Sequence, residues 1–252
     1  MSQPSTIEFV HVSYRLGTSR ELLFDVNLSI ATGEIFMLLG RSGSGKTTSL
    51  KLINRLLTPT AGEVRVEGVA TTRWDAIALR RRIGYAIQEI GLFPHYTVGQ
   101  NIGLVPKLER WPKTKINDRV REVMSLVDIP LDFIDRYPHQ LSGGQRQRVG
   151  LARALAVDPP ILLMDEPFGA LDPLSRTQLQ KEFQHLQQRL KKTVVFVTHD
   201  VGEALLLGDR IALLQEGKLL NVQTPKEFLT SNDPTTNAYV EAFRAGYKVL
   251  EA

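Results

Sequence analysis

The chain alternates between short, unbroken apolar runs and segments with helical periodicity. Residues 35–39, 161–164 and 193–198 are continuous apolar runs that end in glycine or polar residues. Such runs are typical of parallel strands that are buried on both faces. Residues 6–16 alternate weakly and predict another strand, and residues 62–68 predict a strand in antiparallel pairing. The pattern therefore predicts an α/β protein.

Helical periodicity fills the segments between these runs. Residues 46–57 follow the first run, and residues 175–190 separate the two later runs, as a βαβ crossover requires. Residues 84–88 predict a short strand. From about residue 97 to residue 137 the pattern is helical and is interrupted by three prolines, which indicates an inserted helical subdomain. The segment from Pro225 onward predicts short helices.

Composition narrows the class of protein. Hydrophobic residues make up 42% of the 252 residues and charged residues 23%, as in ordinary globular proteins. The absence of cysteine excludes disulfides, a thiolate nucleophile and cysteine-based metal sites. The net charge of +4 is spread along the chain; its densest basic run, 80–82, is interpreted as a solvated face, so no nucleic-acid partner is expected. The N-terminus lacks a signal-peptide pattern, and no apolar stretch approaches the ~20 residues of a spanning helix, so we expect a soluble, cytosolic type of chain.

The segment GRSGSGKTT (40–48) satisfies the pattern G-x-x-x-x-G-K-[ST] between an apolar run and a helical segment. Its glycines allow successive backbone N–H groups to point into one concavity, and the following helix adds its positive N-terminal end. Lys46 can reach the β- and γ-phosphates of a nucleotide, and the Thr47 hydroxyl can bind Mg²⁺. The candidate nucleotide-binding residues here are Gly40, Arg41, Ser42, Gly43, Ser44, Gly45, Lys46, Thr47 and Thr48.

Polar residues follow two of the apolar runs directly. Asp165 and Glu166 come after the run 161–164, and His199 comes after the run 193–198. Open α/β sheets bind ligands at the carboxyl ends of their strands, where the phosphate loop also lies. Asp165 is thus a candidate to hold Mg²⁺ through its hydration shell, Glu166 to polarise an attacking water, and His199 to reach the γ-phosphate.

The segment LSGGQRQRVGLARALA (141–156) places Ser-Gly-Gly before a helical pattern, which makes a second anion-binding helix N-terminus. The candidate residues are Ser142, Gly143, Gly144 and Gln145. From the residues alone, two arrangements stay open. The two phosphate-binding elements meet on one nucleotide within a monomer, or each serves a nucleotide that is shared with another copy.

These motifs together resemble the ATP-binding subunit of ABC transporters over nearly the whole chain. Residues 40–48 look like the Walker A motif, 141–145 like the ABC signature, 161–166 like Walker B, and 169–172 like the D-loop, with Asp172 near the dimer seam. The resemblance implies a P-loop NTPase fold. This fold has a mostly parallel core sheet, an N-terminal antiparallel β subdomain and an inserted α-helical subdomain.

The resemblance also implies further roles and boundaries. Gln88 matches the Q-loop glutamine and joins Thr47 and Asp165 as a metal-site residue. Tyr14 matches the aromatic residue that stacks on adenine, although the segment 17–24 stretches its distance from the phosphate loop. His199 matches the switch histidine. The chain is then a single ATPase cassette over residues 1–252, with the helical subdomain and signature at about 97–155 and a short helical tail at about 225–252.

For partners, the resemblance implies that two copies pair head to tail when ATP binds. Walker A of one copy and the signature of the other then enclose each ATP with Mg²⁺. It further implies integral-membrane permease subunits, an indirect link to a solute-binding protein, and a peripheral position on the cytoplasmic face of the inner or plasma membrane. The segment 88–102 is expected to receive the permease. Leu92, Phe93 and Tyr96 in it are either core residues or part of that docking groove.

Within this family, the segments 53–64, 79–95, 101–108 and 136–145 look like the importer ATPases for quaternary amines such as glycine betaine, choline and carnitine. Many such proteins carry a C-terminal pair of CBS domains, which we do not expect here. The expected activity is Mg-dependent ATP hydrolysis coupled to transport. The alternatives are the cassette of another importer, for an amino acid or other solute, the cassette of a lipid exporter, and a soluble ABC ATPase acting on nucleic acid. The last lacks support, because no sustained heptads separate Lys46 from Leu141.

Overall fold

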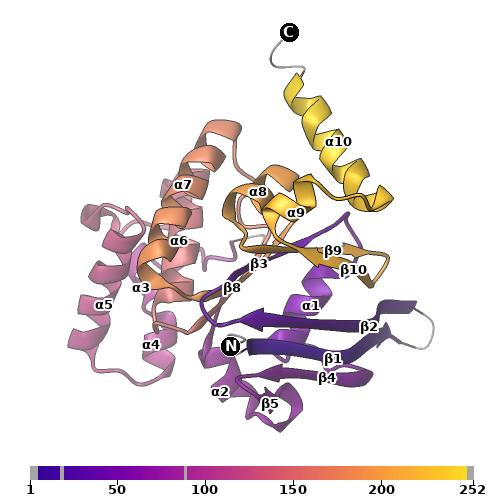
Figure 1. The fold of residues 1–252 in the computed structure, drawn as a ribbon. Helices are drawn as coiled ribbons and strands as arrows, with labels where there is room; N and C mark the ends of the chain where they lie inside the picture. Colours follow the sequence, from indigo (N-terminus) through magenta and orange to yellow (C-terminus); the bar gives the residue numbers. More distant parts are fainter. Residues whose placement is uncertain (1–4, 18–19, 88–89, 249–252) are drawn as a thin grey trace. The chain divides into compact units, whose positions relative to one another are not determined.

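The computed structural model, drawn as a ribbon in Figure 1, describes residues 5–17, 20–87 and 90–248. Its contacts divide the chain into two compact units. The first unit joins residues 1–76 to residues 193–252, and the second comprises residues 77–192. The first unit is therefore made from two chain segments that the second unit separates in sequence.

An antiparallel sheet forms the N-terminal part of the first unit. Its strand order is β2 (Arg20–Ala31), β1 (Ser5–Leu16), β4 (Ala61–Val66) and β5 (Val69–Ala70). The expected strands at 6–16 and 62–68 are present as β1 and β4, and they pair antiparallel.

Strand β2 is not anticipated by the hydrophobic pattern. Its pairing with β1 shifts register several times, and both strands contain a residue with positive φ, His11 at 50° and Asp25 at 47°. Each irregularity interrupts the two-residue alternation by which a half-buried strand is recognised. Residues 20–24 of the stretched segment are therefore the beginning of a twelve-residue strand.

The first unit also contains a second group of strands, in the order β10 (Lys218–Gln223), β9 (Arg210–Gln215), β3 (Ile35–Leu39) and β8 (Thr193–Thr198). Strand β3 pairs in parallel with both β8 and β9, and all five of its residues are buried. This explains why its sequence is a continuous apolar run. Strand β10 returns antiparallel to β9.

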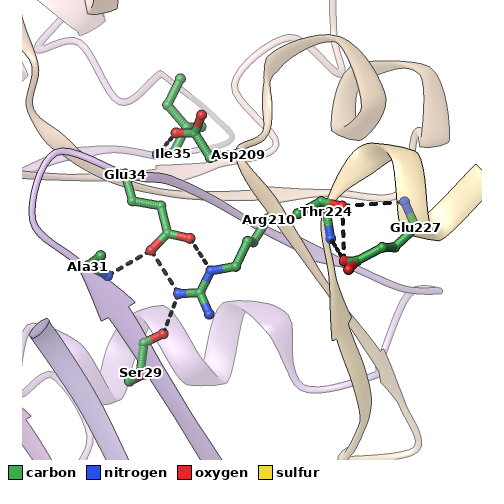
Figure 2. A network of polar contacts seen from close by, with 8 residues as sticks. All are labelled: Ser29, Ala31, Glu34, Ile35, Asp209, Arg210, Thr224 and Glu227. Atoms are coloured by element: carbon green, nitrogen blue, oxygen red, sulfur yellow. Dashed lines mark hydrogen bonds and ion pairs between the residues drawn. The ribbon is translucent and has the colours of Figure 1, made fainter. Parts of the chain in front are cut away.

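A polar network fixes the amino-terminal ends of β3 and β9 (Figure 2). The Arg210 guanidinium donates to both carboxylate oxygens of Glu34, with distances of 2.5 and 2.8 Å, although Glu34 is only 7% exposed. The Ile35 N–H donates to Asp209 Oδ2 at 2.8 Å. Glu34 is buried and Arg210 is half-buried, and their bonds connect the residue directly before β3 to the first residue of β9. The network thereby aligns the opposite, carboxyl ends of these strands.

The helices of the first unit are short except for the last one. They are α1 (Lys46–Ile53), the 3-10 turn Thr71–Arg73, α8 (Val201–Leu207), α9 (Pro225–Leu229) and α10 (Pro234–Lys248). Helix α1 ends at Ile53 rather than at residue 57. Arg55 has a φ of 53°, and Asn54 Oδ1 accepts the Leu56 N–H at 3.2 Å.

The second unit combines two parallel strands with helices. Its strands are β6 (Ile83–Ala86) and β7 (Ile161–Asp165), which pair from Ile83↔Ile161 to Ala86↔Met164. Its helices are α2 (Ala76–Arg81, starting at the boundary), α3 (Val98–Ile102), α4 (Leu104–Leu108), α5 (Lys113–Leu126), α6 (Gly143–Leu155) and α7 (Pro173–Leu190), with 3-10 turns at Leu131–Phe133 and Pro138–Gln140. The helices expected from residue 97 onward thus belong to this unit.

Candidate functional site

The phosphate-loop candidate connects β3 to α1 in the first unit. Gly43 and Gly45 have φ values of 79° and 104°, which L side chains rarely adopt. A Cβ on Gly45 would lie 2.6 Å from Leu23 Cδ2, and one on Gly40 would lie 2.3 Å from the Leu214 carbonyl oxygen. The glycines are therefore required both by the turn of the loop and by the strands that pack behind it.

Lys46 and Ser44 are the polar side chains buried in this loop. The Lys46 ammonium donates to the carbonyl oxygens of Gly40 and Arg41 at 2.8 and 2.9 Å, and the residue is 4% exposed. Ser44 Oγ is also buried and makes no hydrogen bond with any described residue. A buried hydroxyl without a hydrogen-bond partner destabilises the fold unless a bound ligand supplies that partner. An ammonium and a hydroxyl donor at a helix N-terminus fit the oxygens of a phosphate chain.

The C-terminal hairpin supports the same loop. The Gly217 N–H, in the turn between β9 and β10, donates to the Ser44 carbonyl oxygen at 3.2 Å. The Gly217 carbonyl accepts the Phe24 N–H at 2.9 Å. Gly217 has a φ of 78°, and a Cβ there would lie 2.6 Å from the Leu22 carbonyl oxygen. This residue, which sequence analysis does not single out, joins the phosphate loop to strand β2.

Tyr14 is linked to the phosphate loop by one intervening residue, Leu23. It pairs with Leu23 across β1 and β2, and the Leu23 side chain is the group nearest to the position of a Cβ on Gly45. The extra residues between Tyr14 and the loop are thus taken up by the hairpin, which brings the two back together. Tyr14 is 8% exposed, so its ring can stack on adenine only if neighbouring groups move and uncover one of its faces. The expected stacking stays a prediction.

His199 lies at the loop's edge of the strand group. In the parallel register Leu39 pairs with Thr198, so Gly40 and His199 leave neighbouring strands at the same end. The His199 side chain is exposed. Thr47 and Thr48 are half-buried in the first turn of α1. The first unit thereby places His199 at the same strand ends as residues 40–48, whereas Tyr14 is linked to the loop through Leu23.

In the second unit, Asp165 is the last residue of strand β7 and Glu166 follows it directly, as expected. Asp165 is 5% exposed, and the Tyr85 hydroxyl on β6 donates to its Oδ2 at 3.4 Å. Burial raises the pKa of the Tyr85 hydroxyl above its usual value, and the Asp165 charge raises it further, so the hydroxyl stays a donor. Glu166 is half-buried and has a φ of 45°, an unusual backbone conformation for a glutamate. Gln88 lies outside the described residues.

The signature candidate forms the N-terminus of α6. Ser142 Oγ accepts the Gln145 N–H at 3.2 Å, and Gln145 Oε1 accepts the Ser142 N–H at 2.9 Å. This reciprocal cap leaves the N–H groups of Gly143 and Gly144 without partners within the helix. A Cβ would meet nothing closer than 3.8 Å at Gly143 and 3.9 Å at Gly144. The packing of this unit therefore does not require glycine at either position.

The D-loop candidate lies beside the signature in the second unit. The Leu171 side chain is the nearest atom group to a Cβ on Gly143. Asp172 caps α7 by accepting the Ser175 N–H at 3.0 Å, and these hydrogen bonds hold the pKa of Asp172 below its usual value. Leu174, in the first turn of α7, is 85% exposed.

Two grooves of the second unit border the segment that follows residue 89. Phe93, 40% exposed, lines a groove of about 360 Å³ with Gly91 and Arg153, whereas Tyr96 lines another of about 730 Å³. Leu92 is half-buried. Arg153 on α6 donates to the carbonyl oxygens of Ile90 and Gly91, both at 2.6 Å. Sequence analysis does not single out Arg153, because a basic residue in a helical pattern is usually expected to face solvent.

The described residues lack two features, a cluster of metal ligands and a membrane-spanning helix. In residues 5–17, 20–87 and 90–248, no three His, Asp or Glu side chains cluster as a metal site would require. Mg²⁺ is commonly held by one or two protein ligands and the substrate's phosphates, so no such cluster is needed. No helix within these same ranges has the length and apolar character for crossing a bilayer.

The loop, with its left-handed glycines, lysine and helix N-terminus, defines a P-loop nucleotide-binding protein. Comparison with known proteins makes this assignment specific. Residues 23–169 match the family described as "ABC transporter". The glycine betaine uptake system ATP-binding protein YehX of Escherichia coli (strain K12) is 50% identical over 224 residues, which cover 89% of this chain and 72% of that protein. The chain therefore belongs to the ABC transporter family, as the motifs predict.

Two further similarities extend over most of the chain. The choline transport ATP-binding protein OpuBA of Bacillus subtilis (strain 168) is 49% identical over 98% of this chain, and the chain spans 64% of that protein's length. The dimeric, post-hydrolysis structure of the ATP-binding cassette MJ0796 bound to ADP and Pi has a TM-score of 0.77 and 35% identity, covering 87% of this chain and 98% of that one. The predicted fold class is confirmed.

Proposed function

We propose that the chain is the ATP-hydrolysing subunit of a membrane importer for a quaternary amine such as glycine betaine or choline. The observation that carries the nucleotide part is the loop itself, in which Lys46 and the unpartnered Ser44 hydroxyl are buried around left-handed glycines. The solute class is supported by the relatives OpuBA and YehX, whose names specify choline transport and glycine betaine uptake.

Binding the triphosphate is the task of the first unit. Lys46 donates to two loop carbonyls, and we expect its ammonium to exchange these bonds for stronger, charge-assisted bonds to phosphate oxygens. Ser44 Oγ gains the partner that it lacks. We propose Thr47, Gln88 and Asp165 as the residues that hold Mg²⁺, which when bound would neutralise charge on the phosphates. The Tyr85 hydroxyl orients the Asp165 carboxylate.

Hydrolysis is assigned to the carboxylate of Glu166 and the imidazole of His199. Glu166 would orient and deprotonate the attacking water, because a carboxylate held at a fixed backbone position is suited to act as a general base. His199 would donate to the γ-phosphate, and its place beside Gly40 at the strand ends supports that role. The exposed imidazole is accessible to a bound triphosphate.

We further propose that Ser142–Gln145 bind the nucleotide of a second copy. The two glycines of α6 carry N–H groups without helix partners, and nothing inside their own unit requires glycine there. Close approach of an external anion to the backbone explains both facts. The dimeric state of the cassette MJ0796 supports the same arrangement.

The membrane partners are proposed to be integral permease subunits, with the chain on the cytoplasmic face of the membrane. Exposed Phe93 and the grooves lined by Phe93 and Tyr96 support docking of a permease segment there. A solute-binding protein would act indirectly, through the permease. In this arrangement the chain itself never contacts the solute.

Calorimetric titration with MgATP tests the nucleotide part. Wild type should bind ATP, and Lys46→Ala should lose tight binding because the loop loses its buried cation. Lys51→Ala is the matched control, since Lys51 is exposed on the same helix. Equal ATP affinity for Lys46→Ala and wild type would refute the assignment.

Uptake by cells tests the solute class. The native copy is replaced by Glu166→Gln, and uptake of labelled glycine betaine, choline and an amino acid is compared with wild type. Loss of quaternary-amine uptake alone supports the proposal. Loss of amino-acid uptake alone would favour another importer, and unchanged uptake of all three with altered lipid distribution would favour an exporter.

A further inference from the structure

The last described helix, α10, packs on the first unit through one face. Thr236, Val240 and Phe243 recur at helical spacing, and the first two are 0% and 1% exposed. Asn221 on β10 donates to Thr236 Oγ1 at 2.8 Å, and Arg244 donates to the Leu229 carbonyl at 3.2 Å. Helix α10 contacts both α9 and α8. It is thus docked at its beginning and along its length.

Phe243 reaches the first turn of α8. A Cβ on Gly202 would lie 3.3 Å from Phe243 Cε2 and 3.1 Å from Asp200 Oδ1, both tighter than ordinary contacts. Gly202 does not have a positive φ, so its backbone conformation alone does not require glycine. The absence of a side chain at residue 202 makes room for the Phe243 ring beside the helix cap.

The same turn holds the backbone of His199 from both sides. The Asp200 N–H donates to Thr198 Oγ1 at 2.9 Å, and Thr198 Oγ1 donates to the buried Glu203 at 2.5 Å. Asp200 Oδ1 accepts the N–H groups of Gly202 and Glu203 at 2.7 and 3.2 Å. These hydrogen bonds close a compact network over residues 198–203, and the Phe243 side chain lies against that network at Gly202.

We propose that Phe243 is a positioning residue for His199, acting through its contact with the first turn of α8 at Gly202. The inference rests on the proposed function, in which His199 contacts the γ-phosphate. The loop that binds the nucleotide is built from other residues, so displacement of His199 should slow turnover and leave ATP affinity unchanged. The C-terminal helix then adjusts hydrolysis without touching the nucleotide.

The test compares Phe243→Ala with Gly202→Ala in the full chain. The first removes the ring, and the second pushes the turn away from it while favouring helix formation. Arg244→Ala is the control, because it breaks the bond from α10 to Leu229 and leaves the ring contact. Three quantities are measured: ATP turnover by phosphate release, ATP affinity by calorimetry, and the His199 imidazole NMR signal, which His199→Gln identifies among the five histidines.

We expect turnover to fall about tenfold in Phe243→Ala and Gly202→Ala, since small misplacements of a catalytic group have effects of this size. ATP affinity should stay within about twofold of wild type, because the phosphate loop is unchanged. The His199 signal should shift in both variants, and Arg244→Ala should match wild type in all three. An unshifted His199 signal in folded Phe243→Ala and Gly202→Ala would overturn the proposal. If wild type failed to hydrolyse ATP, the proposed function would fail, and the NMR comparison would still decide this inference.

Discussion

Arg153, in the signature helix, donates a hydrogen bond to the main-chain carbonyl of Ile90 at 2.6 Å. Ile90 has a φ of 36°, and a Cβ on Gly150 of the same helix would lie 3.0 Å from its Cγ2. Burial lowers the pKa of Arg153, yet a guanidinium keeps its charge at neutral pH. The helix that begins with the signature therefore holds the segment that borders the proposed permease groove.

Arg153→Met should release that segment. Loss of hydrogen bonds from a charged donor should lower the free energy of unfolding by about 1.5–3 kcal/mol. Hydrogen exchange of the backbone at residues 90–93 should become faster, as mass spectrometry of peptides can measure. Arg189→Met removes an exposed arginine and serves as the control. Identical exchange in wild type and Arg153→Met would contradict this role.

Mixing two inactive chains tests the two-copy site. Ser142→Arg spoils the signature, and Lys46→Ala spoils the phosphate loop. Their heterodimer contains one site with an intact loop from the first chain and an intact signature from the second, so the mixture should regain part of the ATPase activity. Each variant alone should be inactive. A mixture that forms heterodimers and stays inactive would show that the signature does not act across two copies.

Glu166→Gln should separate binding from hydrolysis. The amide keeps the size of the side chain but cannot accept a proton at neutral pH, so turnover should fall by ~10²–10⁴. ATP binding should persist, and slow hydrolysis should leave an ATP-bound dimer that size-exclusion chromatography detects. We expect wild type to be mainly monomeric without its membrane partners. Wild-type turnover in the variant would move the base to another residue, with His199 the first candidate.

Tyr14→Ala should weaken ATP binding by about 1–3 kcal/mol if the ring stacks on adenine. Because Tyr14 is 8% exposed, the substitution should also destabilise the first unit, so binding is measured well below the unfolding temperature. Tyr14→Phe keeps the ring and should bind ATP as wild type does. Unchanged affinities of folded Tyr14→Ala for both ATP and GTP would remove this residue from the site.

Acid should loosen the start of α10 through Asp233. Hydrogen bonds from the Thr236 N–H at 2.8 Å and from its hydroxyl at 3.0 Å hold the pKa of Asp233 below its usual value. A carboxylate whose pKa is lower in the folded than in the unfolded chain stabilises the fold above the unfolded pKa, about 3.9, and loses this effect as pH falls further. Urea unfolding between pH 5 and pH 3 should therefore show a smaller pH dependence for Asp233→Asn than for wild type. Equal slopes would exclude this contribution.

Much of the architecture could be predicted because local rules and tertiary structure agree. The run at 35–39 is continuous since both faces of β3 are buried, and residues 40–48 follow a pattern whose spacing dictates the loop. Strand β2 could not be predicted, because register shifts and the left-handed backbone at Asp25 interrupt its alternation of apolar and polar residues. The end of α1 could not be predicted, because Asn54 and Arg55 end the helix while the helical pattern of apolar residues continues.

The placement of a candidate residue was predictable where its side chain acts within its own loop or helix: Lys46 lies buried in the loop, and Ser142 caps α6. Contacts made through the backbone were not. Gly217 acts through its N–H and its carbonyl, and Arg153 binds carbonyls distant in sequence, so neither leaves a local pattern. Tyr14 shows the same limit in reverse. The sequence motif identified Tyr14 as a candidate, but only its pairing with Leu23 shows how the β1–β2 hairpin connects it to the loop.

The hairpin at Gly217 has a consequence for biosynthesis. The phosphate loop spans residues 40–48, yet the N–H that binds the Ser44 carbonyl belongs to Gly217, and the carbonyl behind Gly40 belongs to Leu214. Strand β3 likewise has neither of its parallel partners, β8 and β9, until residues 193–215 are translated. A nascent chain on the ribosome therefore carries the whole loop sequence long before the loop can assume its shape. Capture of ATP therefore has to wait until residues 193–217 have been synthesised.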